Sequence, residues 1–169
     1  MNNFGLVVIG AHSGVWLSSL LDEHKDRNIL LVEPVPYNIA LLKENTTKYK
    51  NITIETSAVS EKNEIKKFYY VKHDAVKKLG KHWASGIGSF DKQHILNHKY
   101  KRFMVTDIDI EEIDVQYLTF SNLMKKYSVS SIDLLQIDVE GAEFQILNSI
   151  NFEKIEIKKI IFEFKHFDG

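Results

Sequence analysis

The stretch Leu6–Gly14 reads "LVVIGAHSG", and its two halves predict a buried strand and the loop that follows it. "LVVIG" is a short, unbroken apolar run with β-branched residues, which is typical of a parallel strand covered on both faces. Gly10 and Gly14 bound the loop, and glycine lets the backbone turn sharply and leaves room for a close approach. We expect a helix after this loop, with Ser13 as its cap.

The same alternation continues after this stretch and predicts an α/β fold. Strand and helix patterns alternate twice more within about sixty residues, which indicates a parallel sheet with helices on both faces. Right-handed crossovers would place the first strand in the middle of that sheet. The expected architecture is a Rossmann-like, doubly wound, mostly parallel sheet. Its later elements are "GVWLSSLLDEH" with Val15, Leu17, Leu20 and Leu21 on one face, "NILLVEP", "YNIALLKENTTK", the single strand "NITIETSAV", "YLTFSNLMKKYS", "SIDLLQID", "EGAEFQILNSI" and the fifth strand "IKKIIFEF".

The middle of the chain is less regular, and we interpret Lys62–Ile113 as an insertion with its own hairpin. "IKKFYYV" reads as a strand, whereas the glycines and serines of "ASGIGS" predict a mobile loop rather than a core element. Beside the sheet, such a loop would serve as a lid. We find no linker between domains, so residues 1–169 are expected to form a single domain. The sequence stops soon after the fifth strand, so the sheet is expected to be short at its C-terminal side.

The loop and the second strand together indicate a nucleoside site. Glu33 ends the second strand about twenty residues after the loop, where this architecture places a carboxylate on ribose hydroxyls. The phosphate-binding pattern G-x-G-x-x-G is absent, which favours a ligand without a pyrophosphate. S-adenosylmethionine (SAM) is such a ligand, and its carboxylate could be held at the start of the helix. A glycine-bounded turn also occurs in α/β proteins without ligands, and His12 by itself is better explained as a loop residue than as a catalyst.

A second candidate site follows the fourth strand, in "LLQIDVEGAEFQIL" (Leu134–Leu147). Asp138 falls where the strand ends, beside the first strand and across from "GAHSG". Its carboxylate could contact the ammonium group of SAM or polarise an acceptor hydroxyl. Glu140 and Glu143 lie in the next turn and the start of the next helix, where the exposed N–H groups favour a negative charge. That structural explanation is sufficient for Glu143 and insufficient for Asp138.

With "VIGAHSG", "LLVEPVPYNIALLKEN", "SAVS" and "IDLLQIDVEGAEFQIL" in this order, the chain resembles the FkbM-type SAM-dependent methyltransferases over nearly its whole length. The resemblance implies a class I SAM methyltransferase fold and methyl transfer to oxygen on a sugar or natural-product hydroxyl. It implies that Glu33 binds the ribose and that the segment Ser57–Val59, with Ser57 and Ala58, passes the adenine. The loop that would wrap the methionine half of SAM consists of Gly10, Ala11, His12, Ser13 and Gly14.

Two features depart from the family pattern. Val8 stands where the family often has an acidic residue that braces the loop. Methyltransferases of this architecture also usually extend the sheet with two further strands, and no sequence remains for them here. As an apolar strand at the edge of a sheet, "IKKIIFEF" would favour a homodimer.

Three residues are candidates for the base that takes a proton from the acceptor hydroxyl: Asp138, Glu140 and His166. His166 follows the fifth strand, at the carboxyl end of the sheet. His94 and His98 are four residues apart and could share a helix face. Because no carboxylate signature accompanies them, we expect no metal site.

The composition narrows the classes of partner. A formal charge of -1 argues against duplex DNA or an anionic membrane surface, which need a basic field. The absence of cysteine excludes disulfides and thiolate metal sites. The N-terminus has no basic leader, and no apolar run approaches the roughly 18 residues of a membrane span. We therefore expect a soluble, cytoplasmic protein with a small-molecule or carbohydrate acceptor.

Two other functions are compatible with the same elements. A nucleotide-dependent oxidoreductase could use the same strand and helix plan, although the missing G-x-G-x-x-G loop counts against it. A degenerate or truncated module that binds SAM without activity is consistent with Val8 and the short C-terminal part.

Overall fold

The computed structural model describes residues 2–80, 82–97, 105–139 and 141–163. Within this part, the chain divides into two compact units. The first contains the described residues up to Glu64 and from Gln116 onward, and the second is Ile65–Val115. The second unit covers nearly the same residues as the segment interpreted as an insertion. Each unit has a hydrophobic core of its own.

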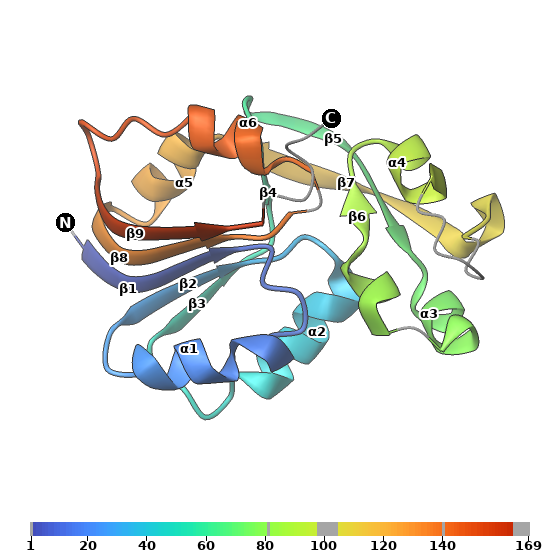
Figure 1. The fold of residues 1–169 in the computed structure, drawn as a ribbon, viewed down its shortest axis with the longest axis horizontal. Coiled ribbons are helices and arrows are strands. Elements are labelled where there is room, and N and C mark those ends of the chain that lie inside the picture. Colours follow the sequence, from blue (N-terminus) through green and yellow to red (C-terminus); the bar gives the residue numbers. More distant parts are fainter. Residues whose placement is uncertain (1, 81, 98–104, 140, 164–169) are drawn as a thin grey trace. The chain divides into compact units, whose positions relative to one another are not determined.

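The first unit is built on a parallel sheet with the strand order β3-β2-β1-β8-β9 (Figure 1). β1 pairs in parallel with β2 and β8, β2 with β3, and β8 with β9, so the prediction of a doubly wound sheet with the first strand in the middle is confirmed. The strands are β1 (Asn2–Ile9), β2 (Asn28–Val32), β3 (Ile52–Glu55), β8 (Val129–Ile137) and β9 (Glu156–Phe162).

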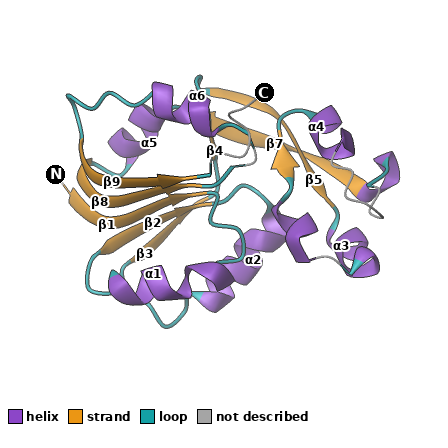
Figure 2. Ribbon diagram, viewed as in Figure 1, coloured by secondary structure: helices purple, strands orange, loops and turns teal. Residues whose placement is uncertain are grey.

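Helices cover both faces of this sheet (Figure 2). The turn η1 (Val15–Leu17), α1 (Ser18–Glu23) and α2 (Pro36–Asn45) lie on one face, and α5 (Phe120–Lys126) and α6 (Glu143–Asn148) lie on the other. Successive strand side chains point to opposite faces of the sheet. Leu6 and Val8 therefore belong to the core on the α1 side, whereas Val7 and Ile9 belong to the core on the α5 side. Burial on both faces explains why β1 reads as an unbroken apolar run.

The centre of the sheet contains the point at which the strand order reverses. β1 is followed by η1, α1 and β2 on one side, whereas its other neighbour, β8, is followed by α6 and β9 on the opposite side. In open parallel sheets, ligands bind outside the carboxyl ends of the strands at this reversal. The two loops that leave it begin at Gly10 and Asp138.

A second sheet has the strand order β4-β7-β5-β6. Its strands are β4 (Ala58–Val59), β5 (Glu64–Val71), β6 (Gly88–Ser89) and β7 (Ile110–Leu118). The antiparallel pair of β5 and β6 lies in the second unit, together with α3 (His73–Leu79), η2 (His82–Gly86), α4 (Lys92–Asn97) and η3 (Asp107–Asp109). The expectation that "ASGIGS" is not a core element is wrong, because Ala84 and Ile87 are buried in the core of this unit and Ser89 pairs with Tyr69. Its mobility stays a prediction.

The third strand differs from the prediction. "NITIETSAV" is not one strand: β3 ends at Glu55, and Ala58 begins β4 in the other sheet. The side chain of Glu55 accepts a hydrogen bond from the N–H of Ser57 at 3.0 Å, which stabilises the turn between the two strands. The spacing of apolar residues does not reveal a side-chain contact of this kind, so the sequence pattern could not predict the break between the two strands.

The first helix also begins differently. Residues 15–17 form a 3₁₀ turn, and the α-helix starts only at Ser18. Val15 is therefore 66% exposed instead of facing the core with Leu17 and Leu21. Ser13 is not the cap, because Gly14, in the left-handed region, occupies that position without a side-chain hydrogen bond.

The predicted helix "YLTFSNLMKKYS" is shorter than expected. Tyr117 and Leu118 belong to the end of β7, where they pair with Ala58 and Val59. Thr119 then caps α5 by accepting a hydrogen bond from the N–H of Asn122 at 3.2 Å. The capping residue, rather than the apolar spacing, sets the start of the helix.

Candidate functional site

The loop after β1 adopts an unusual backbone conformation. Gly10, His12 and Gly14 all have positive φ angles, of 88°, 52° and 76°. For His12, a residue with a β-carbon, this conformation costs about 1–3 kcal/mol and persists only where surrounding contacts impose it. Two of those contacts are main-chain hydrogen bonds, from the N–H groups of Gly10 and Ala11 to the carbonyl oxygen of Val32 at 3.0 and 2.9 Å. The end of β2 thus fixes the loop.

Glu33 provides a further support for the same loop. One carboxylate oxygen accepts the N–H of His12 at 2.8 Å, and the other accepts the N–H of Val35 at 2.9 Å and the side-chain amide of Asn38 at 3.4 Å. The residue is 5% exposed. Burial raises the pKa of Glu33 to about 7, although the hydrogen bonds from Val35, His12 and Asn38 act in the opposite direction. Glu33 therefore braces the loop at His12.

Asp138 follows β8 directly beside the start of this loop. Its N–H donates to the carbonyl oxygen of Ile9 at 2.9 Å, which extends the pairing of the two strands by one residue. A β-carbon on Gly10 would lie 1.8 Å from the carbonyl oxygen of Asp138. The two predicted sites therefore meet at the reversal of the strand order, and the contact requires glycine at position 10.

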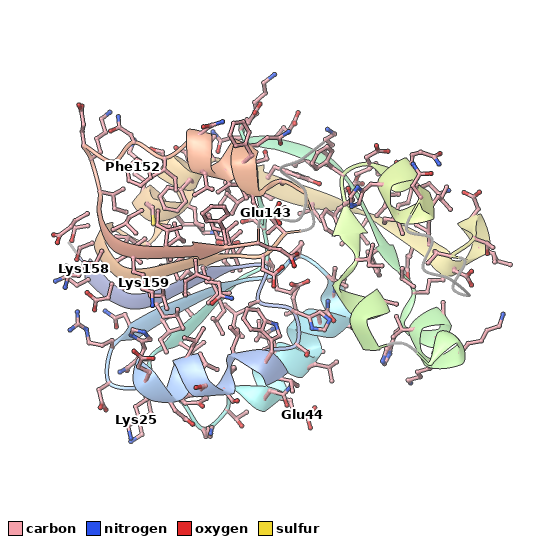
Figure 3. All side chains as sticks on the ribbon, viewed as in Figure 1. Lys25, Glu44, Glu143, Phe152, Lys158 and Lys159 are labelled. Carbon is pink, nitrogen blue, oxygen red and sulfur yellow. The ribbon has the colours of Figure 1, made fainter. Side chains whose placement is uncertain are left out.

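Glu143 has a structural role, as expected, but it acts on the turn that precedes the helix. Its side chain does not simply face the exposed N–H groups of the helix: it is 1% exposed, and Figure 3 shows it between α6 and the sheet. Its two carboxylate oxygens accept the N–H groups of Val139 and Gly141 at 3.1 and 3.0 Å. Glu143 thus holds the backbone that follows Asp138, as Glu33 holds the backbone at His12.

A third buried carboxylate, Glu55, was not identified by the sequence reasoning. It ends β3, is 4% exposed, and accepts the N–H of Ser57. Its main-chain carbonyl oxygen accepts the N–H of Glu33 at 3.0 Å, so the two strand ends are directly linked. Its position in the sequence could have identified it, because Glu55 stands at the end of the third strand as Glu33 stands at the end of the second.

The structure brings most of the predicted cofactor residues to one edge of the sheet. Gly10 contacts Asp138, His12 contacts Glu33, and Glu33 is linked through Glu55 to Ser57. Ala11, Ser13 and Ala58 are buried on the same segments. Glu140 and His166 lie outside the described residues, as does His98. The roles assigned to all these residues stay predictions.

Ser57 has a feature that fits a ligand. The residue is 2% exposed, and its hydroxyl oxygen has no hydrogen-bond partner within the part of the chain that the structure describes. A buried polar atom without a partner is costly and requires an explanation, such as a ligand that supplies the bond.

Among the described residues, no group of three or more His, Asp and Glu side chains could hold a metal ion. None of their helices is long and apolar enough to cross a membrane.

Comparison with protein families identifies a family whose sequence model matches the chain. The sequence model of the methyltransferase FkbM domain matches residues 9–169, nearly the whole chain. Its span includes the loop after β1, the ends of β2 and β3, and the segment after β8. Comparisons with the curated proteins and with the solved structures found no match.

Proposed function

The chain belongs to the FkbM methyltransferase family, and from this premise we propose that it is a SAM-dependent O-methyltransferase acting on a sugar or natural-product hydroxyl. The observation that carries the proposal is the meeting of the loop Gly10–Gly14, Glu33 and Asp138 at the reversal of the strand order. That position is where open parallel sheets bind their ligands.

The residues present fit SAM. Gly10 and Gly14 allow the loop to keep its positive φ angles and to lie directly against Asp138 at the carboxyl end of the sheet. Glu33 would accept a hydrogen bond from a ribose hydroxyl through the lone pair on Oε2 that its protein donors leave unused. Ser57, with its unpartnered hydroxyl, would meet the adenine.

SAM, when bound, would supply an electrophilic methyl carbon on a sulfonium centre. The protein would then orient the acceptor oxygen in line with that carbon and exclude water, which can provide most of the acceleration. Asp138 is the described candidate for the base that takes the hydroxyl proton as the new bond forms. Glu143 would contribute indirectly, because it fixes the backbone that follows Asp138.

The experiment that tests this proposal is calorimetric titration of the folded chain with SAM and, separately, with NAD. Micromolar binding of SAM without binding of NAD would support the proposal. Binding of NAD instead would favour the oxidoreductase. Binding of neither ligand by a folded protein would overturn the proposed use of SAM and leave a family member without a working cofactor site.

A methyl-transfer assay then separates an enzyme from an inactive binding module. The chain would be incubated with SAM carrying a labelled methyl group and a panel of sugars and other hydroxyl acceptors. Label on oxygen in any acceptor would support the reaction class. Binding of SAM with no transfer to any acceptor of the panel would favour the inactive module.

A further inference from the structure

Glu55 forms a charged cluster that the proposed reaction does not use. One of its carboxylate oxygens accepts hydrogen bonds from the Lys126 ammonium at 2.6 Å and from the Tyr127 hydroxyl at 2.7 Å. Its other oxygen accepts the N–H of Ser57 at 3.0 Å. Lys126 ends α5 and Tyr127 follows it, so the cluster ties the end of that helix to the turn between β3 and β4.

The cluster is not explained by stability alone. Burial by itself would raise the pKa of Glu55, but the hydrogen bonds from Lys126, Tyr127 and Ser57 hold it below its ordinary value. The carboxylate is therefore ionised and fully engaged while only 4% exposed. Only the carboxylate is buried, because the Lys126 side chain is 52% exposed, and an ion pair that includes an exposed lysine adds little to stability. The main effect of the cluster is therefore the local geometry that it fixes.

The geometry that Glu55 defines is that of Ser57. The Glu55 carboxylate accepts a hydrogen bond from the N–H of Ser57. The buried hydroxyl of Ser57 has no hydrogen-bond partner among the described residues. The same segment is linked to the proposed ribose carboxylate, because the N–H of Glu33 donates to the carbonyl oxygen of Glu55. A nucleoside whose ribose is held at Glu33 would therefore present its base to Ser57.

We infer that Glu55, held by Lys126 and Tyr127, is a positioning residue that places the Ser57 hydroxyl against the adenine of the cofactor and so sets the selectivity for that base. This inference rests on the proposed function. Glu55 makes no contact with the ligand in this scheme, and Ser57 is the group that does. Because a site built to hydrogen-bond a group discriminates against ligands that lack it, a displaced Ser57 should weaken selectivity as well as affinity.

The test uses S-adenosylhomocysteine and its deaminated analogue, S-inosylhomocysteine, in calorimetric titrations of the full chain. The two ligands share the ribose and the amino acid and differ only at the base. The wild type is expected to prefer the adenine compound. Glu55→Ala should lower affinity for it about tenfold, the effect of one lost hydrogen bond, and should bring the affinities for the two ligands closer together.

Asp133→Ala is the matched control, because Asp133 also accepts from two cations, Arg27 at 3.0 Å and Lys158 at 2.8 Å, but lies before the carboxyl end of β8. It should leave both affinities unchanged, whatever it does to the melting temperature. Tyr127→Phe keeps the ring and removes one donor to Glu55, so it should change the affinity and the base preference in the same direction as Glu55→Ala, but by less. It replaces Glu55→Ala if that variant fails to fold.

The outcomes separate the two proposals. If the folded wild type binds neither ligand, the proposed function fails and the inference fails with it. If the wild type binds the two ligands equally, or if folded Glu55→Ala and Tyr127→Phe keep the wild-type affinity and preference, the inference alone is overturned. Equal losses of affinity for both ligands, with the preference intact, would also overturn it, since that is the result of a merely structural role.

Discussion

The carbonyl oxygen of Asp138 occupies the space that a β-carbon on Gly10 would need, at a separation of 1.8 Å. Because Gly10 also has a φ angle of 88°, glycine is required there for two independent reasons. This contact joins the loops that leave β1 and β8, and it is the structural basis of the candidate site.

Gly10→Ala is therefore expected to lower the free energy of unfolding by about 3 kcal/mol, as the sum of backbone strain and steric overlap, and to abolish SAM binding. Thermal unfolding and calorimetry would measure the two effects. Gly80→Ala is a matched control, because Gly80 also has a positive φ angle of 61° but no atom within 4 Å of the added carbon. It should cost only about 1–2 kcal/mol and leave binding intact. Equal effects of the two substitutions would contradict the importance of the Asp138 contact.

The pKa of Glu33 predicts how nucleoside binding depends on pH. Burial raises this pKa to about 7, so the carboxyl of the free protein becomes increasingly neutral as the pH falls below that value. Ribose hydroxyls donate to the ionised form, so binding must remove the proton. The affinity for adenosine should fall by up to about tenfold per pH unit below pH 7. Titration at several pH values would measure this slope, and Glu33→Gln should bind more weakly with no slope.

The same carboxyl should influence stability in the opposite direction. Its folded pKa lies above the ordinary value of 4.5, so the folded chain holds the proton more tightly than the unfolded chain does. The stability that it contributes is fully present below pH 4.5 and is lost as the pH rises to about 7. The loss is about 3 kcal/mol at most. Denaturant unfolding of the wild type and Glu33→Gln should diverge over this range, and parallel profiles would count against a raised pKa.

Glu143 is expected to stabilise the turn after Asp138. Glu143→Ala removes the acceptor of the Val139 and Gly141 N–H groups and should reduce the free energy of unfolding by about 1–3 kcal/mol. Glu143→Gln, which keeps an oxygen, should cost less. Glu153→Ala, at an exposed position nearby, should change stability little. If Glu143→Ala were as stable as the Glu153→Ala control, the two hydrogen bonds would not matter to the fold.

Asp138→Asn tests the proposed base. The amide is nearly the same size but cannot take up a proton, so the rate of methyl transfer should fall by about 10²–10⁴-fold while the protein stays folded. Binding of SAM should change less than the rate if Asp138 acts on the acceptor. A variant with full activity would exclude Asp138 as the base. A loss confined to SAM affinity would assign it to the cofactor instead.

The edge strand β9 makes association a further expectation. It ends the strand order of its sheet in the described part of the chain, and Ile161 and Phe162 on it are 38% and 40% exposed. Exposed apolar edge strands pair readily with another chain, so we propose a homodimer through β9. Sedimentation should show association at micromolar concentration, and Ile161→Lys should weaken it. A strict monomer under these conditions would reject the dimer.

The sequence by itself determined the order of the elements and the central place of β1. Both follow from local patterns: the unbroken apolar runs of strands buried on two faces, and the right hand of the crossovers. It also located Glu33 and Asp138, because a carboxylate is unexpected inside an unbroken apolar run and therefore marks the residue at which each buried strand ends.

The tertiary structure decided which carboxylates hold the loops. Glu55 divides "NITIETSAV" between two sheets, and Glu143 turns back onto the N–H groups of Val139 and Gly141. It also decided that Lys126 and Tyr127, about seventy residues away, neutralise and position Glu55. These contacts join side chains to backbone across different elements, and hydrophobic periodicity carries no information about such pairs. A buried carboxylate is identified only when its donors are known, and only the folded chain brings those donors to it.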